Sequence, residues 1–141
     1  MLNNTKIDSI IPAHTFHMSK RVPGKFKQVI EQVTEELRKE GFGIISTIDL
    51  RKAFNKKISV DFRRYTILGA CNPQYAYEAL CEEDKMGIFL PCNVVVQQHE
   101  NGQVEVSIVN PEELMHGVDD LNIKNFATEI KEAMQNVLNR L

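Results

Sequence analysis

The chain has 141 residues, of which 43% are hydrophobic and 26% are charged, and its formal net charge is -2. This composition predicts one compact domain with an apolar core, and the slight negative charge gives no general attraction to a nucleic-acid backbone. The N-terminus lacks the pattern of a signal peptide, and no apolar run approaches the about 20 residues that a membrane-spanning helix needs. We therefore expect a cytoplasmic protein, with neither nucleic acid nor membrane as a partner.

Residues 1–10 are predicted to be a polar lead-in to a single domain over residues 11–141. The alternating run after Pro12 predicts a first strand. One face of this strand would carry His14, Phe16 and Met18.

The next segment predicts the clearest helix. Pro23 suits a first helical turn, and Gly41 suits the left-handed residue that ends a helix. Apolar side chains recur between them at helical spacing, which requires a sheet to pack against. These side chains are Phe26, Val29, Ile30, Val33 and Leu37.

A strand is predicted in GFGIISTID (residues 41–49), and a short helix in LRKAFNKKI (residues 50–58). The helix carries a basic face, for which a solvated surface is the favoured interpretation over an anion site. The basic residues are Arg51, Lys52, Lys56 and Lys57.

RYTILGAC (residues 64–71) predicts the following strand, and PQYAYEALCEED (residues 73–84) predicts a helix. A further strand is expected from near Ile88 through residue 98. The buried stripe of the helix would be Tyr75, Ala76, Ala79 and Leu80.

Asn101-Gly102 is a strong hairpin signal, because a two-residue turn needs positive φ at both positions. With such a loop, Val104 faces His99, Val106 faces Gln97 and Ile108 faces Val95. The same register leaves apolar side chains on the open sheet face, which suggests a partner surface, although a bulge would shift the faces by one residue. The residues placed opposite are Cys92, Val94, Val96 and Val109.

Asn110 and Pro111 predict a helix start, and the chain then continues as a helix. Its apolar stripe would be Ile123, Phe126, Ile130, Met134, Val137 and Leu141. The element order predicts an α+β fold with two layers, a mostly antiparallel sheet and helices on one face.

The segment around Cys71 is the candidate site. Asn72-Pro73 predicts a helix start directly after this cysteine, and free N–H groups there would favour a thiolate or an anion. The alternative is structural, since cysteine is small and often buried, and Cys92 has the same two interpretations. The two thiols would meet if their strands are antiparallel, and would lie about 15 to 20 Å apart if the strands are parallel. Cys81 is predicted to pack within a helix.

Other chemistry has little support. The four histidines show no HxxxH or CxxH spacing, and no GxSxG, GxGxxG or GxxxxGK[ST] motif is present. We therefore predict neither a metal nor a cofactor, and no catalytic motif indicates an enzyme. An odd number of cysteines without CxxC spacing suits reduced thiols.

The motifs ILGACNP at residues 67–73 and LPCNVVV at residues 90–96 resemble the family called domain of unknown function 302. The resemblance covers nearly the whole chain from the first strand onward. It implies a small bacterial or archaeal α+β protein with a topology like that of the TATA-binding protein, and a homodimer, but no reaction. The family positions that match are Lys52, Cys71, Asn72, Pro73, Pro91, Cys92, Asn93 and Met115.

Two hypotheses follow. The first is a dimeric binding or regulatory module, with a pocket for a small ligand such as an anion at the Cys71-Asn72 helix start and the open sheet face as the dimer surface. The second is a thiol-dependent redox or soft-metal function that uses Cys71 and Cys92 together. The candidate ligand-binding residues are Cys71, Asn72, Cys92, Asn93, Lys52 and Met115.

Overall fold

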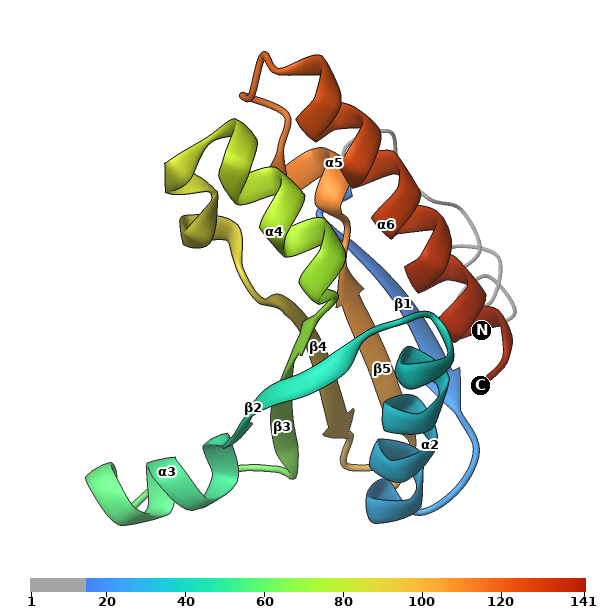
Figure 1. Cartoon of the computed structure of the whole chain (residues 1–141). Helices are drawn as coiled ribbons and strands as arrows, with labels where there is room; N and C mark the ends of the chain where they lie inside the picture. Colours follow the sequence, from blue (N-terminus) through green and yellow to red (C-terminus); the bar gives the residue numbers. More distant parts are fainter. Residues whose placement is uncertain (1–14) are drawn as a thin grey trace.

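Five strands form one antiparallel sheet in the order β1-β5-β4-β3-β2 (Figure 1). The structure is a computed structural model that describes residues 15–141, so the predicted lead-in and His14 lie outside the described residues. The strands are β1 (His17–Val22), β2 (Gly43–Asp49), β3 (Tyr65–Cys71), β4 (Cys92–Gln98) and β5 (Val104–Val109). The helices are α2 (Phe26–Lys39), α3 (Leu50–Ile58), α4 (Pro73–Glu82), the 3-10 helix η1 (Asp84–Phe89), α5 (Pro111–Leu114) and α6 (Leu121–Asn139). The predicted α+β class is confirmed.

Several predicted boundaries need correction. The first strand begins only at His17, so Phe16 precedes it and is exposed. Pro23 lies ahead of α2, because the chain turns at Gly24, where φ is +120°, before the helix starts. Leu80 is exposed and does not belong to the buried stripe of α4.

The segment around Ile88 forms η1 and is not the start of a strand. The Glu83 carboxylate accepts a hydrogen bond from the Lys85 backbone N–H and begins this helix, and β4 starts at Cys92. Within residues 15–141, none of the helices has the length and apolar character needed to cross a bilayer.

The β4–β5 hairpin forms where expected, but its loop has three residues. The Gly102 N–H donates to the His99 carbonyl at 2.9 Å, and only Gly102 has positive φ, at +85°. This is a turn followed by one left-handed residue, which shifts the register by one position relative to the two-residue loop. The pairs are Val104 with Gln98, Val106 with Val96, and Ile108 with Val94.

The shifted register overturns the predicted faces. Cys92, Val94 and Val96 share one face with the buried side chains of β5. The opposite face of the hairpin carries a mixture of polar and apolar side chains, so the predicted apolar surface for a partner does not form there. Its residues are Asn93, Val95, Gln97, Glu105, Ser107 and Val109.

Helices α2 and α6 cover the apolar face of the sheet (Figure 1). We call this cluster the sheet core, and its side chains are almost completely buried because two amphipathic helices and four strands meet there. It includes Val33, Leu37, Met134 and Val137 of the helices, and Val94, Val96, Val104, Val106 and Ile108 of the strands.

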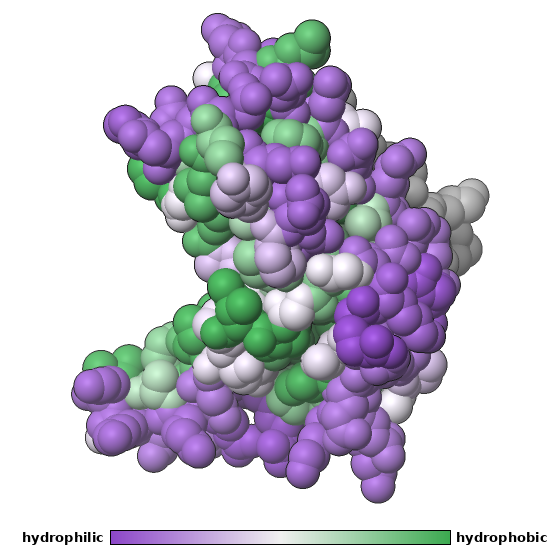
Figure 2. Space-filling model, in the orientation of Figure 1, coloured by the Kyte–Doolittle hydropathy of each residue, from purple (hydrophilic) through white to green (hydrophobic). Residues whose placement is uncertain are grey.

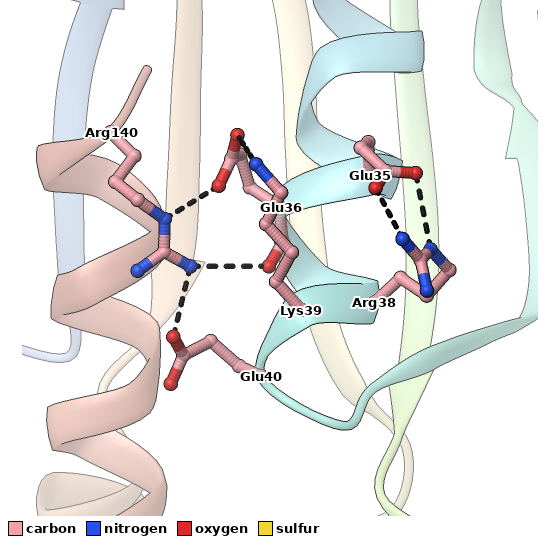
Figure 3. A network of polar contacts seen from close by, with 6 residues as sticks. All are labelled: Glu35, Glu36, Arg38, Lys39, Glu40 and Arg140. Carbon is pink, nitrogen blue, oxygen red and sulfur yellow. Dashed lines mark hydrogen bonds and ion pairs between the residues drawn. The ribbon is translucent and has the colours of Figure 1, made fainter.

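Polar contacts join the two covering helices at their C-terminal ends (Figure 3). Arg140 Nε lies 2.5 Å from Glu36 Oε1, and Arg140 Nη2 lies 2.9 Å from Glu40 Oε2. The hydrogen bond from Arg140, followed by that from Lys39, holds the pKa of Glu36 below its usual range. Glu36 is therefore a largely buried carboxylate whose charge is compensated in the folded state.

Strand β1 completes the sheet beside β5, far from it in the sequence. Ser19 Oγ donates to Ser107 Oγ at 2.8 Å across a separation of 88 residues. Lys20 Nζ donates to the backbone carbonyl of Leu138 at 3.0 Å and so attaches β1 to the end of α6.

The segment over residues 50–64, which we call the α3 arm, projects from the other edge of the sheet (Figure 1). Asp49 begins α3 by accepting from the Lys52 N–H, and Ser59, with φ of 56°, ends it. The rings of Phe54 and Phe62 lie 5.2 Å apart, which holds the returning chain against the helix. The predicted short helix over residues 50–58 is confirmed.

Candidate functional site

The two cysteines of the predicted site lie at the same end of the sheet. Strands β3 and β4 are antiparallel, and Ala70 pairs with Cys92. Cys71, the last residue of β3, is therefore one position from the partner of Cys92. The structure thus selects the antiparallel of the two arrangements that the sequence left open.

A small apolar cavity of about 40 Å³ lies beside this end of the sheet, and both cysteines line it. The opposite walls come from α4, η1, α5 and α6, and no charged side chain of residues 15–141 lines the cavity. We call the buried side chains behind these walls the cavity cluster. They are Ala79, Met86, Met115, Ile123 and Ala127, with Phe89, Val118 and Phe126 packed against them.

Four of the six predicted site residues meet at this cavity, namely Cys71, Asn72, Cys92 and Met115. Asn93 does not, because it follows Cys92 on a strand and is placed on the opposite face of the sheet. Lys52 does not either. It lies on α3 after the Asp49 end of β2, whereas the Gly43 end of β2 pairs with Cys71.

Asn72 begins α4 as predicted, but it uses the N–H groups that an anion would need. Its Oδ1 accepts from Gln74 N at 3.0 Å and from Tyr75 N at 3.3 Å, and its carbonyl accepts from Ala76 N. Pro73 has no N–H. The first turn of α4 therefore offers no free backbone donor, which speaks against the anion interpretation of this helix start.

The Cys92 thiol is buried, and its surroundings disfavour the thiolate. Burial raises the pKa of Cys92 to about 11, and the nearby Cys71 adds to this shift. Cys92 therefore stays protonated near neutral pH. Cys81 is exposed on α4 and not packed within the helix layer, which corrects the prediction made for it.

Sequence reasoning missed the walls that η1 contributes. Met86 and Phe89 line the cavity from η1, whereas the sequence predicts a strand from near Ile88 and assigns Met86 to no element. Ile123 and Phe126 also line it, and their helical spacing in the sequence was the usable signal. Tyr75 lies at the rim, where burial raises the pKa of its hydroxyl and the neighbouring Glu129 raises it further.

No group of three histidine, cysteine, aspartate or glutamate side chains in the described part of the chain is arranged to hold a metal ion. His99, one of the candidates considered, instead contacts Glu105 at 2.9 Å.

Comparison with known proteins gives one consistent result. The family model described as "Domain of unknown function DUF302" matches residues 18–141. Among solved structures, the chain is similar to an uncharacterized conserved DUF302 protein from Bacillus stearothermophilus, with 33% identity and a TM-score of 0.82 over 89% of this chain and 98% of that chain. No curated protein matches the chain.

Proposed function

We propose that this chain, which belongs to the DUF302 family, is a dimeric binding module that holds a small uncharged molecule in the cavity beside Cys71 and Cys92. The family description names no activity. The observation that carries the proposal is the cavity itself, because it is apolar and lies between short elements at one end of a rigid sheet.

The lining indicates the class of ligand. Two cysteines and two methionines, Met86 and Met115, place polarizable sulfur atoms around an apolar space, and Asn72 is the polar side chain at its edge. A charged ligand would lose its hydration without gaining a charged partner. We therefore replace the predicted anion with a small, neutral, polarizable ligand.

The test uses xenon as a probe, since dry apolar cavities bind it and a single atom suits the small volume of this cavity. With methyl-labelled methionine, the resonances of Met86 and Met115 should shift on addition of the probe. Met18 and Met134 lie in the sheet core and serve as internal controls that should not shift.

A matched pair of variants completes this test. Ala127→Leu fills the space at the cavity wall and should abolish the shifts, whereas Ala53→Leu on α3 should leave them unchanged. Equal shifts at all four methionines, or none, would contradict the proposal.

The thiol-dependent alternative is supported by one observation, which is that the two thiols line a common cavity. Because the pKa of Cys92 is raised to about 11, Cys71 would have to be the reactive thiol. Single-cysteine variants that keep Cys71, Cys81 or Cys92 can be alkylated over a pH series.

The alternative requires Cys71 to react faster than the exposed Cys81 at neutral pH. The binding proposal instead expects no acceleration at Cys71. Both expect Cys92 to react about 100-fold more slowly than a free thiol at pH 8. Metal analysis of the purified protein tests the soft-metal form of the alternative.

A further inference from the structure

The two edges of the sheet are protected to very different degrees. Edge strand β1 contains Lys20 and Arg21, and Lys20 is bonded to the end of α6. Edge strand β2 has the sequence GIISTID, with no cation and no proline over its seven residues, and one shift in its pairing with β3 between Ile44 and Ser46. Its Ile45 is 64% exposed. Natural sheets normally protect an edge with cations, prolines or bulges, so an apolar edge that has only one irregularity is a template for another strand.

The α3 arm follows this edge and is strongly basic. Residues 51–64 contain six lysines and arginines and one acidic residue, Asp61. The arm also exposes apolar side chains, including Ile58, which is 63% exposed. Ring contacts among Phe54, Phe62 and Tyr65 fix its shape, and Arg63 lies 4.4 Å from the centre of the Phe62 ring.

The surface formed by α4 and η1 lies across a hollow from the arm (Figure 2), and its sequence gives it the opposite charge. The segment from α4 to η1 contains one lysine and four acidic residues, which are Glu78, Glu82, Glu83 and Asp84. Exposed apolar side chains accompany them, including Tyr77 and Ile88, the latter 79% exposed. In Figure 2 the outline is hollowed between these elements and the arm, with hydrophobic side chains on its walls.

We propose that β2 pairs antiparallel with β2 of a second copy of this chain, and that the α3 arm of each copy lies on the α4–η1 surface of the other. The proposal rests on the dimer of the proposed function and names its surface. A two-fold axis across β2 would join the two sheets into one continuous sheet.

The topology directs the arm to this surface. In an antiparallel pair, the Asp49 end of the second copy's β2 lies beside the Gly43 end of the first. Gly43 pairs with Cys71, after which α4 begins, so the second copy's arm starts beside the cavity end of the sheet.

Charge and area both favour a second copy as the occupant. The basic arm and the acidic α4–η1 surface are complementary in charge. In a two-fold dimer each arm contacts the acidic surface of the other copy, so both arms are paired. Stable dimers bury about 1,200 to 2,000 Å², which the pairing of two seven-residue strands alone would not reach. The two arms supply the additional contact.

The test measures the mass and the dissociation constant of the full chain by sedimentation at micromolar concentration. Ile45→Lys places an unpaired ammonium group in the paired edge of each copy, and should raise the dissociation constant about 100-fold. Phe16→Lys is the matched control, because Phe16 is 72% exposed and lies at the other edge. It should leave the dissociation constant unchanged.

Exchanging the charges of the arm and of the α4–η1 surface tests whether the two are in contact in the dimer. This test does not depend on whether the Ile45→Lys variant folds. Lys56→Glu with Lys57→Glu alters only exposed positions of α3 and should weaken the dimer about tenfold. Combining it with Glu78→Lys and Glu82→Lys should restore the affinity.

The outcomes separate the two proposals. A dimer that withstands Ile45→Lys, is weakened equally by Phe16→Lys, or is not restored by the charge exchange overturns the surface but leaves the dimer of the proposed function standing. A parent chain that is monomeric overturns both the dimer and its proposed surface. This holds also if the arm is then found to bind nucleic acid, or the β2 edge an extended peptide.

Discussion

The sheet core and the cavity cluster share helix α6 but are built differently. The sheet core joins β-branched side chains on strands in register with long helical stripes, and most of its members are completely buried. The cavity cluster joins alanines and methionines from short elements, including the four-residue α5 and the six-residue η1, and leaves a cavity of about 40 Å³. Regular elements fill space efficiently, and short elements that meet at their ends do not. Stability and binding are therefore expected to reside in different clusters.

The largest expected effect on stability comes from replacing one buried methionine by alanine in each cluster. Met134→Ala in the sheet core should lower the free energy of unfolding by about 3 to 5 kcal/mol, because the surrounding side chains cannot collapse into the space. Met86→Ala in the cavity cluster should cost about 2 kcal/mol, since its walls already tolerate a void. Urea unfolding with unchanged m-values measures both. Equal losses would show that the two clusters are equally well packed.

A smaller difference in stability between the two clusters is expected when a buried side chain is enlarged. Val96→Ile adds one methylene to the sheet core and should cost about 1 to 3 kcal/mol through overpacking. Ala127→Val adds more volume at the cavity and should cost less than about 1 kcal/mol, most of it from the lower helix propensity of valine. Thermal unfolding of both variants checks the order, and a larger loss for Ala127→Val would refute the contrast.

The smallest effect is electrostatic and compares two glutamates, Glu36 on α2, which pairs with Arg140 just after α6, and Glu112 on α5, which pairs with Lys131 on α6. The pKa of Glu36 is lowered by Arg140 and Lys39, and that of Glu112 by Lys131 and Thr128. A lowered pKa means that the stabilisation is complete above the unfolded value of about 4.5 and is lost as pH falls through the folded value.

Glu36→Gln and Glu112→Gln should each flatten the dependence of unfolding free energy on pH below 4.5. For Glu112 the change should not exceed about 1 kcal/mol, since its pair with Lys131 is partly exposed and screened. Urea midpoints at pH 7 and pH 3.5 provide the measurement. A pH dependence identical to that of the parent chain would show that these pairs contribute nothing to acid stability.

Patterns with a single physical interpretation predicted the fold well. The stripe from Val29 to Leu37 and the stop at Gly41 predict α2 because helical spacing and positive φ have few alternatives. Asn72 and Asn110 likewise begin α4 and α5 with their side-chain oxygens. The α+β class and the family resemblance follow from such local signals and from the cysteine motifs.

The errors arise where one residue decides the geometry. Asn-Gly suits a two-residue loop and equally a three-residue loop that ends in Gly102, and this ambiguity placed the side chains of β4 on the wrong face relative to those of β5. At the candidate site, cysteine proximity depended on strand direction, which one sequence cannot supply. The walls at Met86 and Phe89 come from a 3-10 helix, whose short run has no periodicity to detect.

The position of β1 has a consequence for biosynthesis. This strand precedes the other described strands in the chain, its partner β5 follows more than 80 residues later, and Lys20 also bonds to the end of α6. A growing chain must therefore carry β1 without its partner strand until residues 104–109 have been translated. Such long-range closure slows folding and leaves an unpaired strand accessible to other chains during synthesis. The two cations in β1, Lys20 and Arg21, would then disfavour pairing of this strand with other chains both during synthesis and in the folded protein.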